Sequence, residues 1–218
     1  MRKRLSKKEA MEVIEILERT YPKAKAQLNF SNEFELLIAT ILSAQCTDVV
    51  VNKTTENLFR ELKKPRDYID LGEERLIEKI KSCGLANNKS KNIISTCKIL
   101  EEEYGGKVPD KLEELIKLPG VGRKTANVVL SNAFNIPAIA VDTHVFRVSN
   151  RIGLANSSNV ENTEKDLMDI IPKEKWSKTH HLLIFHGRNI CKSRKPLCKE
   201  CPINDKCLYY INNILDDK

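Results

Sequence analysis

The sequence predicts an all-α fold. Apolar residues recur at helical spacing in nearly every segment, capping residues precede most of these segments, and the period-two alternation of strands is almost absent. The 218 residues suffice for one sizeable core or two modest domains. Lysine and arginine number 37 against 30 acidic residues, a net charge of +7, which favours a polyanionic partner without establishing one.

Five helices are predicted in the first half of the chain. Ser6 and Glu9 form a capping box before the first, which ends by Tyr21. Asn32 with Glu35 opens the second, which is apolar on nearly every side and is therefore expected at the centre of a domain. This second helix covers about Phe34–Ala44, and the other three are predicted at about Val49–Leu62, Leu71–Lys81 and Lys89–Tyr104.

The second half is also helical. Asp110 is expected to cap a short helix that ends at Lys117, and Asp142 to cap another that ends near Arg151. The remaining helices are predicted at about Arg123–Phe134, Val160–Ile171 and Trp176–Ile190.

A tight hairpin is predicted at Pro119-Gly120-Val121-Gly122, between two of these helices. Its glycines allow positive φ and a close approach of foreign backbone. The N–H groups that begin the next helix then point outward beside its positive dipole end, which suits a phosphate oxygen. An ordinary corner between helices is the alternative, but Arg123 and Lys124 directly after the hairpin favour a sequence-independent grip on a nucleic-acid backbone.

Lys124 and Asp142 are candidate catalytic residues. A lysine at a helix N-terminus lies at the wrong end of the dipole, which disfavours its ammonium form and suits a nucleophilic amine. A carboxylate such as Asp142 can deprotonate that amine or stabilise a cationic sugar transition state, or it can serve only as a helix cap. We interpret His144 as structural.

Four cysteines near the end of the sequence form a C-x6-C-x2-C-x5-C array, Cys191, Cys198, Cys201 and Cys207. Structural zinc usually takes two short-spaced pairs, so this continuous loop fits a four-iron cluster better, with zinc or free thiols as alternatives. Three cations of the first inter-cysteine loop, Lys192, Arg194 and Lys195, are either solvated or in contact with phosphate. Beside a DNA-gripping hairpin, phosphate contact is the better interpretation. The scattered Cys46, Cys83 and Cys97 are interpreted as small core residues.

Four motifs together carry a family resemblance. Leu-Pro-Gly-Val-Gly-Arg-Lys-Thr-Ala at 118–126, Val-Asp-Thr-His at 141–144, the cysteine array and Leu-Ser-Ala-Gln-x-Thr-Asp at 42–48 resemble endonuclease III, the iron–sulfur DNA glycosylase/AP lyase of the helix-hairpin-helix superfamily. The resemblance implies two helical domains flanking a DNA cleft. One is a six-helix barrel at 24–136, and the other, residues 1–23 with 137–218, carries a [4Fe–4S] cluster.

The resemblance also implies roles for single residues. Lys124 is the nucleophile with Asp142 as its partner, and Gly120, Val121, Gly122 and Arg123 belong to the phosphate-gripping hairpin. Gln45 fills the gap left by a flipped nucleotide, and Leu85 is a wedge on the opposite strand. Cys46 and Ala86 depart from the family's usual residues near the lesion pocket.

The expected activity is removal of oxidised pyrimidines from duplex DNA through a lysine Schiff base, followed by cleavage 3′ to the abasic site by β-elimination. Lys124 disfavours the alternative of a monofunctional adenine- or thymine-mismatch glycosylase. A non-enzymatic iron–sulfur DNA-binding or electron-transfer protein would need neither Lys124 nor Asp142. Since the sequence has no apolar run of transmembrane length and no signal-peptide pattern, we expect a cytoplasmic protein associated with the nucleoid. We also expect it to be a monomer.

Overall fold

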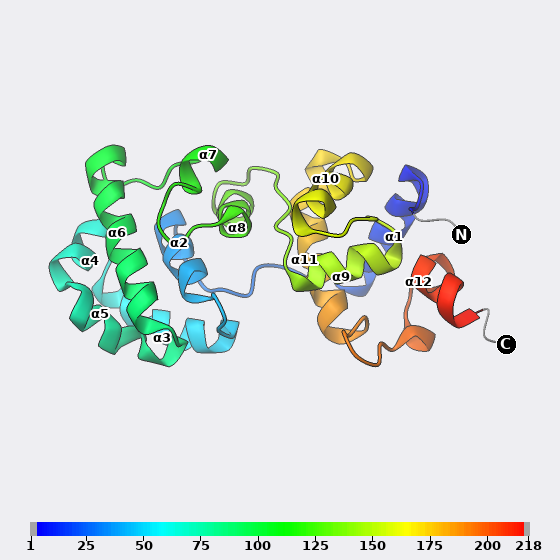
Figure 1. The fold of residues 1–218 in the computed structure, drawn as a ribbon, viewed down its shortest axis with the longest axis horizontal. Coiled ribbons are helices and arrows are strands. Elements are labelled where there is room, and N and C mark those ends of the chain that lie inside the picture. Colours follow the sequence, from blue (N-terminus) through cyan, green and yellow to red (C-terminus); the bar gives the residue numbers. More distant parts are fainter. Residues whose placement is uncertain (1–3, 216–218) are drawn as a thin grey trace. The chain divides into compact units, whose positions relative to one another are not determined.

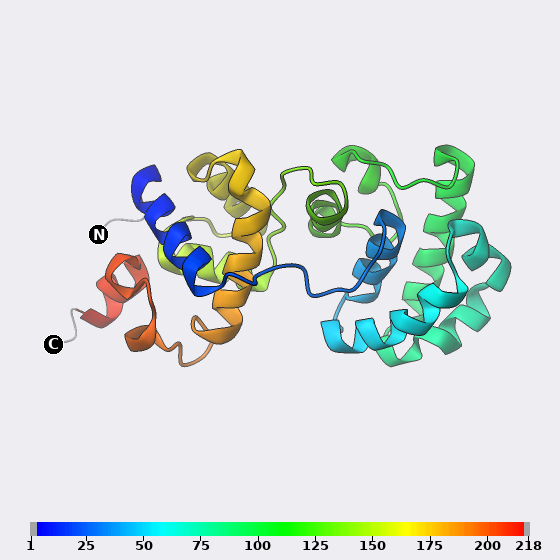
Figure 2. The same ribbon diagram turned by 180° about the vertical axis from the view of Figure 1, so that it is seen from behind.

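The computed structural model describes residues 4–215, and within that range it is helical with no strand, as the sequence predicts (Figures 1 and 2). The chain divides into two compact units. The central unit is Ala26–Ile136, and the terminal unit combines the chain up to Lys25 with the chain from Pro137 onward. None of the described helices is long and apolar enough to span a membrane.

The central unit is built around α2 (Glu33–Leu42), whose residues from Phe34 to Leu42 are all buried. This confirms its predicted central position. Helices α3 (Asp48–Glu61), α6 (Ala86–Tyr104) and α8 (Arg123–Ala133) contact α2, while α4 (Pro65–Leu71) and α5 (Glu73–Ile80) pack on α6. Asn32 caps α2 as predicted, since its side-chain oxygen accepts a hydrogen bond from the Glu35 N–H at 2.8 Å.

Two elements of the central unit differ from the sequence predictions. The sequence pattern gave no sign of α4, whose start is held by Asp67 as it accepts hydrogen bonds from the N–H groups of Lys63 and Lys64. Asp110 is not a cap, because the short helix α7 covers only Leu112–Leu115 and begins after Lys111. The helix also ends at Leu115 rather than at Lys117, and turn residues lead from it into the hairpin.

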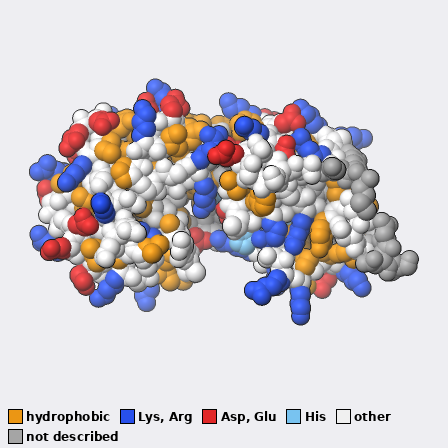
Figure 3. Space-filling model, in the orientation of Figure 1, with side chains coloured by type: hydrophobic (Ala, Val, Ile, Leu, Met, Phe, Trp, Pro, Cys, Tyr) orange, Lys and Arg blue, Asp and Glu red, His pale blue; other side chains and the backbone are white. Residues whose placement is uncertain are grey.

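The terminal unit contains α1 (Lys7–Thr20), α9 (Thr143–Ile152), α10 (Val160–Ile170), α11 (Trp176–Asn189) and the short α12 (Leu208–Tyr210). Helix α9 packs on α11 and α10, and α1 packs on α11. The predicted capping box of α1 is present, with Ser6 and Glu9 bonded reciprocally. On the face shown in Figure 3, basic and acidic side chains are interspersed over the central unit, which agrees with a modest net charge of +7.

Candidate active site and metal centre

The hairpin between α7 and α8 is a tight turn, closed by the hydrogen bond from the Val121 N–H to the Leu118 carbonyl at 3.0 Å. Gly120 has a φ of 78°, and a Cβ there would lie 3.0 to 3.3 Å from the Asn92 side chain of α6. Glycine is therefore required both for its conformation and for space. Thr96 of α6 donates to the Pro119 carbonyl at 2.9 Å, so α6 fixes the hairpin.

Gly122 serves the hairpin in a different way. Its φ of −87° needs no glycine, so only Gly120 uses the positive φ that both glycines allow. A Cβ at Gly122 would meet nothing within 4 Å, which leaves open space before the first turn of α8. No carbonyl of the same helix can accept from the N–H groups of that turn, and the helix dipole is positive there. Open space beside such donors suits an anion.

The sequence-predicted residues around the hairpin have different exposures. Lys124 and Arg123 lie exposed on the first turn of α8. The Val121 side chain is buried, and its N–H is already used within the turn. Lys124 is therefore solvent-exposed and follows Gly122 of the hairpin by two residues, whereas the Val121 side chain packs in the core.

Gln45 and Leu85 lie at strained corners of the central unit. Only four non-glycine residues in the described range have positive φ, namely Gln45 (54°), Leu85 (51°), Asn135 (55°) and Lys195 (51°). Left-handed backbone costs such residues roughly 1–2 kcal/mol, and such strain concentrates at functional sites. Gln45 is exposed and Leu85 is 52% exposed, so both corners present their side chains to solvent.

Asp142 is the N-cap of α9 in the terminal unit. Its Oδ1 accepts a hydrogen bond from the Val145 N–H at 2.7 Å, and the side chain is half-buried. The capping bond fixes the carboxylate at the start of the helix. His144 Nδ1 lies 3.2 Å from an Arg147 guanidinium nitrogen, and burial lowers the pKa of this histidine, consistent with a structural role.

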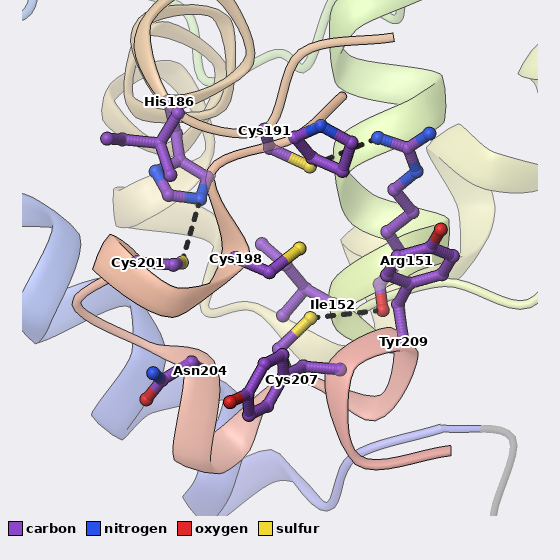
Figure 4. A pocket seen from close by; sticks show the side chains of 12 residues that line it. Arg151, Ile152, His186, Cys191, Cys198, Cys201, Asn204, Cys207 and Tyr209 are labelled. Atoms are coloured by element: carbon purple, nitrogen blue, oxygen red, sulfur yellow. Dashed lines mark hydrogen bonds between the residues drawn. The ribbon is translucent and has the colours of Figure 1, made fainter. Parts of the chain in front are cut away.

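The four cysteines of the array line one pocket of the terminal unit (Figure 4). Cys191 and Cys207 are buried, and Cys198 and Cys201 are half-buried. Burial raises the pKa of the Cys201 thiol to about 11, so a bound cation is needed to stabilise its thiolate at neutral pH. Among the described residues, no three cysteine, histidine or carboxylate side chains are grouped closely enough to hold one metal ion.

Arg147 and Arg151 fix the cysteine loop, a role that the sequence did not predict. Arg151 donates to the carbonyls of Lys192 at 2.7 Å and Ser193 at 3.0 Å. Its guanidinium also lies 3.7 Å from the Cys191 sulfur and 5.0 Å from the centre of the Tyr209 ring. Arg147 donates to the Cys191 carbonyl at 3.0 Å. Two arginines one turn apart after Asp142 are the only sequence signal for this function.

These bonds give the loop between Cys191 and Cys198 a defined shape. Lys192, Arg194 and Lys195 are all exposed on it, and Lys195 takes the left-handed conformation noted above. Three cations are thereby presented on a loop that α9 holds.

His186 is a second residue that the sequence did not single out. Its Nδ1 lies 3.1 Å from the Tyr21 hydroxyl. Its Nε2 lies 3.6 Å from the Cys201 sulfur, as Figure 4 shows. Burial lowers the pKa of His186 to about 4, so the ring is neutral at pH 7. When the Tyr21 hydroxyl donates to Nδ1, the proton on Nε2 faces the sulfur.

The remaining cysteines partly match their interpretation as core residues. Cys83 and Cys97 are buried in the central unit. Cys46 is only partly buried, because it follows the exposed corner at Gln45.

Comparisons with known proteins agree with this geometry. The chain matches the family model described as HhH-GPD superfamily base excision DNA repair protein over residues 38–173. It is 53% identical to endonuclease III of Rickettsia prowazekii (strain Madrid E) over 201 residues, which cover 92% of this chain and 94% of the relative. It is similar to a solved structure of a trapped endonuclease III–DNA covalent intermediate, with a TM-score of 0.90 and 49% identity, covering 95% of this chain and 98% of that one.

A thermostable thymine-DNA glycosylase is less similar. Its TM-score is 0.84 at 26% identity, covering 94% of this chain and 98% of that one. The higher identity to endonuclease III favours the bifunctional enzyme over the mismatch glycosylases. The chain belongs to the endonuclease III family of DNA glycosylases with AP lyase activity.

Proposed function

We propose that this chain removes oxidised pyrimidines from duplex DNA with Lys124 as nucleophile, and then cuts the strand 3′ to the abasic site. The observation that carries the proposal is the exposed Lys124 on the first turn of α8, directly behind a hairpin open to an anion. An ordinary solvated lysine would not account for the adjacent hairpin or for the open space at the N-terminus of α8.

DNA binding begins at the phosphates. The hairpin from Gly120 to Arg123 binds one backbone through the N–H groups and the positive end of α8. The loop bearing Lys192, Arg194 and Lys195 adds cationic contacts from the terminal unit. Neither contact reads a base edge, so the grip is independent of sequence.

Base extrusion uses the two strained corners of the central unit. Enzymes that act on a base must first take it out of the stack, and a poorly stacked damaged base costs least to extrude. Gln45 fills the space that the flipped nucleotide leaves, and Leu85 enters the opposite strand. The exposure of both side chains supports these roles, because the exposed apolar half of Leu85 is stabilised when it is buried among bases.

The chemistry then follows from an amine nucleophile. The neutral amine of Lys124 attacks C1′ of the extruded nucleotide, and the base leaves with the glycosidic electron pair. Loss of the amine proton and ring opening give a protonated Schiff base, which acidifies the 2′ protons. Removal of one of them expels the 3′ phosphate by β-elimination. The Asp142 carboxylate stabilises the positive charge on the sugar during base release.

The four cysteines hold a [4Fe–4S] cluster in this proposal. The continuous C-x6-C-x2-C-x5-C spacing and the pocket that the four cysteines share favour a four-iron cluster over a single zinc. The cluster would crosslink the loop, while Arg151 and His186 of this chain orient Cys191 and Cys201.

The substrate also indicates where the enzyme acts. Damaged chromosomal DNA lies in the nucleoid, so we place the protein in the cytoplasm in association with DNA. The enzyme acts as a monomer in this proposal.

Replacing Lys124 tests the nucleophile. Lys124→Gln is expected to abolish the covalent adduct that borohydride traps on abasic duplex, because no amine remains to form the Schiff base. Affinity for the same duplex should fall only a few-fold, since backbone N–H groups carry most of the phosphate binding. Lys98→Gln, an exposed lysine on α6, is the control and should trap normally. Undiminished trapping by Lys124→Gln would overturn the proposal.

Replacing Asp142 tests the role of its charge. Asparagine still caps a helix, so Asp142→Asn should keep α9 and its bond to the Val145 N–H. Single-turnover base release from a thymine glycol duplex should slow by roughly 100-fold or more, while Kd stays nearly constant, because the stabilised charge develops only in the transition state. Base release at the unmodified rate would leave Asp142 with a structural role alone.

Metal analysis tests the cofactor. The purified chain should contain about four irons and four inorganic sulfides per chain, and Cys198→Ser should lose most of both. Cys46→Ser should retain them, since Cys46 lies in the other unit. One zinc per chain without sulfide would contradict the cluster.

A further inference from the structure

We propose that Lys89 is a positioning residue that holds the two DNA-inserting corners, at Gln45 and Leu85, in one fixed arrangement. The inference rests on the proposed function of these corners. It assigns a role to a buried lysine that touches neither the lesion nor the phosphates in that mechanism.

Lys89 lies in the first turns of α6, and only 4% of the residue is exposed. Its Nζ donates to the Leu42 carbonyl at 2.8 Å and to the Cys83 carbonyl at 2.8 Å. Lysine is rarely buried, because transferring its polar head from water is costly unless it is well bonded. The two carbonyls supply those bonds.

Both carbonyls lie at helix ends. Leu42 is the last residue of α2, and Cys83 is the last residue of the 3-10 helix Lys81–Cys83. Terminal carbonyls have no partner within their own helix, and a cation is favoured at the negative end of a helix. Lys89 therefore satisfies the final carbonyls of two separate elements with one side chain.

Each of these ends leads directly into a strained corner. Gln45 follows Leu42 by three residues, and Leu85 follows Cys83 by two. The backbone N–H of Lys89 also donates to the Leu85 carbonyl at 3.0 Å. One residue thus fixes the chain just before the Gln45 corner and on both sides of the Leu85 conformation.

This arrangement has a specific consequence for the reaction. The two side chains must enter the duplex together, so the distance between their corners matters more than the position of either one. Loss of the Nζ donor leaves two buried carbonyls unsatisfied and lets the corners move independently. Extrusion of a stacked base should therefore become slower. The reaction at an abasic site should change little, because such a site needs little extrusion and the hairpin that binds phosphate is fixed by other residues of α6.

Lys89→Met tests this, because methionine keeps an unbranched stem and removes the donor. Single-turnover base release from a thymine glycol duplex should fall roughly 10- to 100-fold, the scale of a 1 Å misplacement. Borohydride trapping on an abasic duplex should change less than about threefold on that scale. Lys98→Met, the exposed lysine on the same helix, should alter neither rate. An equal loss of both reactions by Lys89→Met would overturn the proposal.

A second background separates this inference from the proposed function. In a Gln45→Ala, Leu85→Ala enzyme both corners keep a Cβ but lose the groups that enter the duplex. Adding Lys89→Met to this enzyme should slow base release by less than about twofold further, because residues that act as one unit have non-additive effects. If the two alanines themselves leave base release unchanged, the proposed role of the corners fails. If the two alanines slow base release and Lys89→Met slows it by the same factor in this background as in the unmodified enzyme, the positioning role fails.

Folding is checked by thermal unfolding of every variant before the rates are compared. If Lys89→Met does not fold, Lys89→Gln replaces it in the same measurements. Glutamine keeps one donor group but is too short to span both carbonyls. A Lys89→Gln enzyme that releases thymine glycol at the unmodified rate would overturn the proposal.

Discussion

One face of helix α6 supports the hairpin and the two corners at Gln45 and Leu85 in the central unit. Lys89, Asn92 and Thr96 are spaced by three and four residues, so they lie on the same side of the helix. Lys89 bonds the carbonyls that precede the Gln45 and Leu85 corners, while Thr96 bonds the hairpin carbonyl of Pro119. The Asn92 side chain lies 3.0 to 3.3 Å from the position that a Cβ at Gly120 would take. Side chains of α6 thereby satisfy and fix the carbonyls of Leu42, Cys83 and Pro119.

Helix α9 has the corresponding function in the terminal unit. Its N-terminus is capped by the Asp142 carboxylate, and its Arg147 and Arg151 side chains bond the cysteine loop. The Asp142 carboxylate and the loop that carries Lys192 to Lys195 are thus both held by α9. This explains how an exposed loop with a left-handed lysine can keep a defined shape. In both units, long polar side chains of a helix fix carbonyls of neighbouring segments.

The sequence was most informative where the signal is local. The caps at Ser6, Asn32 and Asp142, the apolar pattern of α2, and the hairpin all depend on neighbouring residues, and the structure confirms each of these elements. The roles of Lys124, Asp142 and the cysteines in catalysis and metal binding come from the family motifs and remain predictions.

Features that depend on tertiary contacts could not be predicted. Lysine and arginine in a helix normally indicate a solvated face, so Lys89 and Arg151 gave no sign that they bond distant carbonyls. Gln and Leu disfavour left-handed backbone, so the corners at Gln45 and Leu85 could not be inferred from residue type. Helix α4 is short and follows a lysine pair, and the apolar pattern did not distinguish it from a loop.

The central claim is that α6 presents both corners and the hairpin as one rigid surface next to the nucleophile. A crystal structure of the borohydride-trapped complex with a duplex containing an abasic site tests it most directly. The account predicts a bond from Lys124 Nζ to C1′, a phosphate at the N-terminus of α8, and both Gln45 and Leu85 inside the base stack with Lys89 still bonded to Leu42 and Cys83. A sugar bonded to a different residue, or a duplex that leaves one of the corners in solvent, would contradict it.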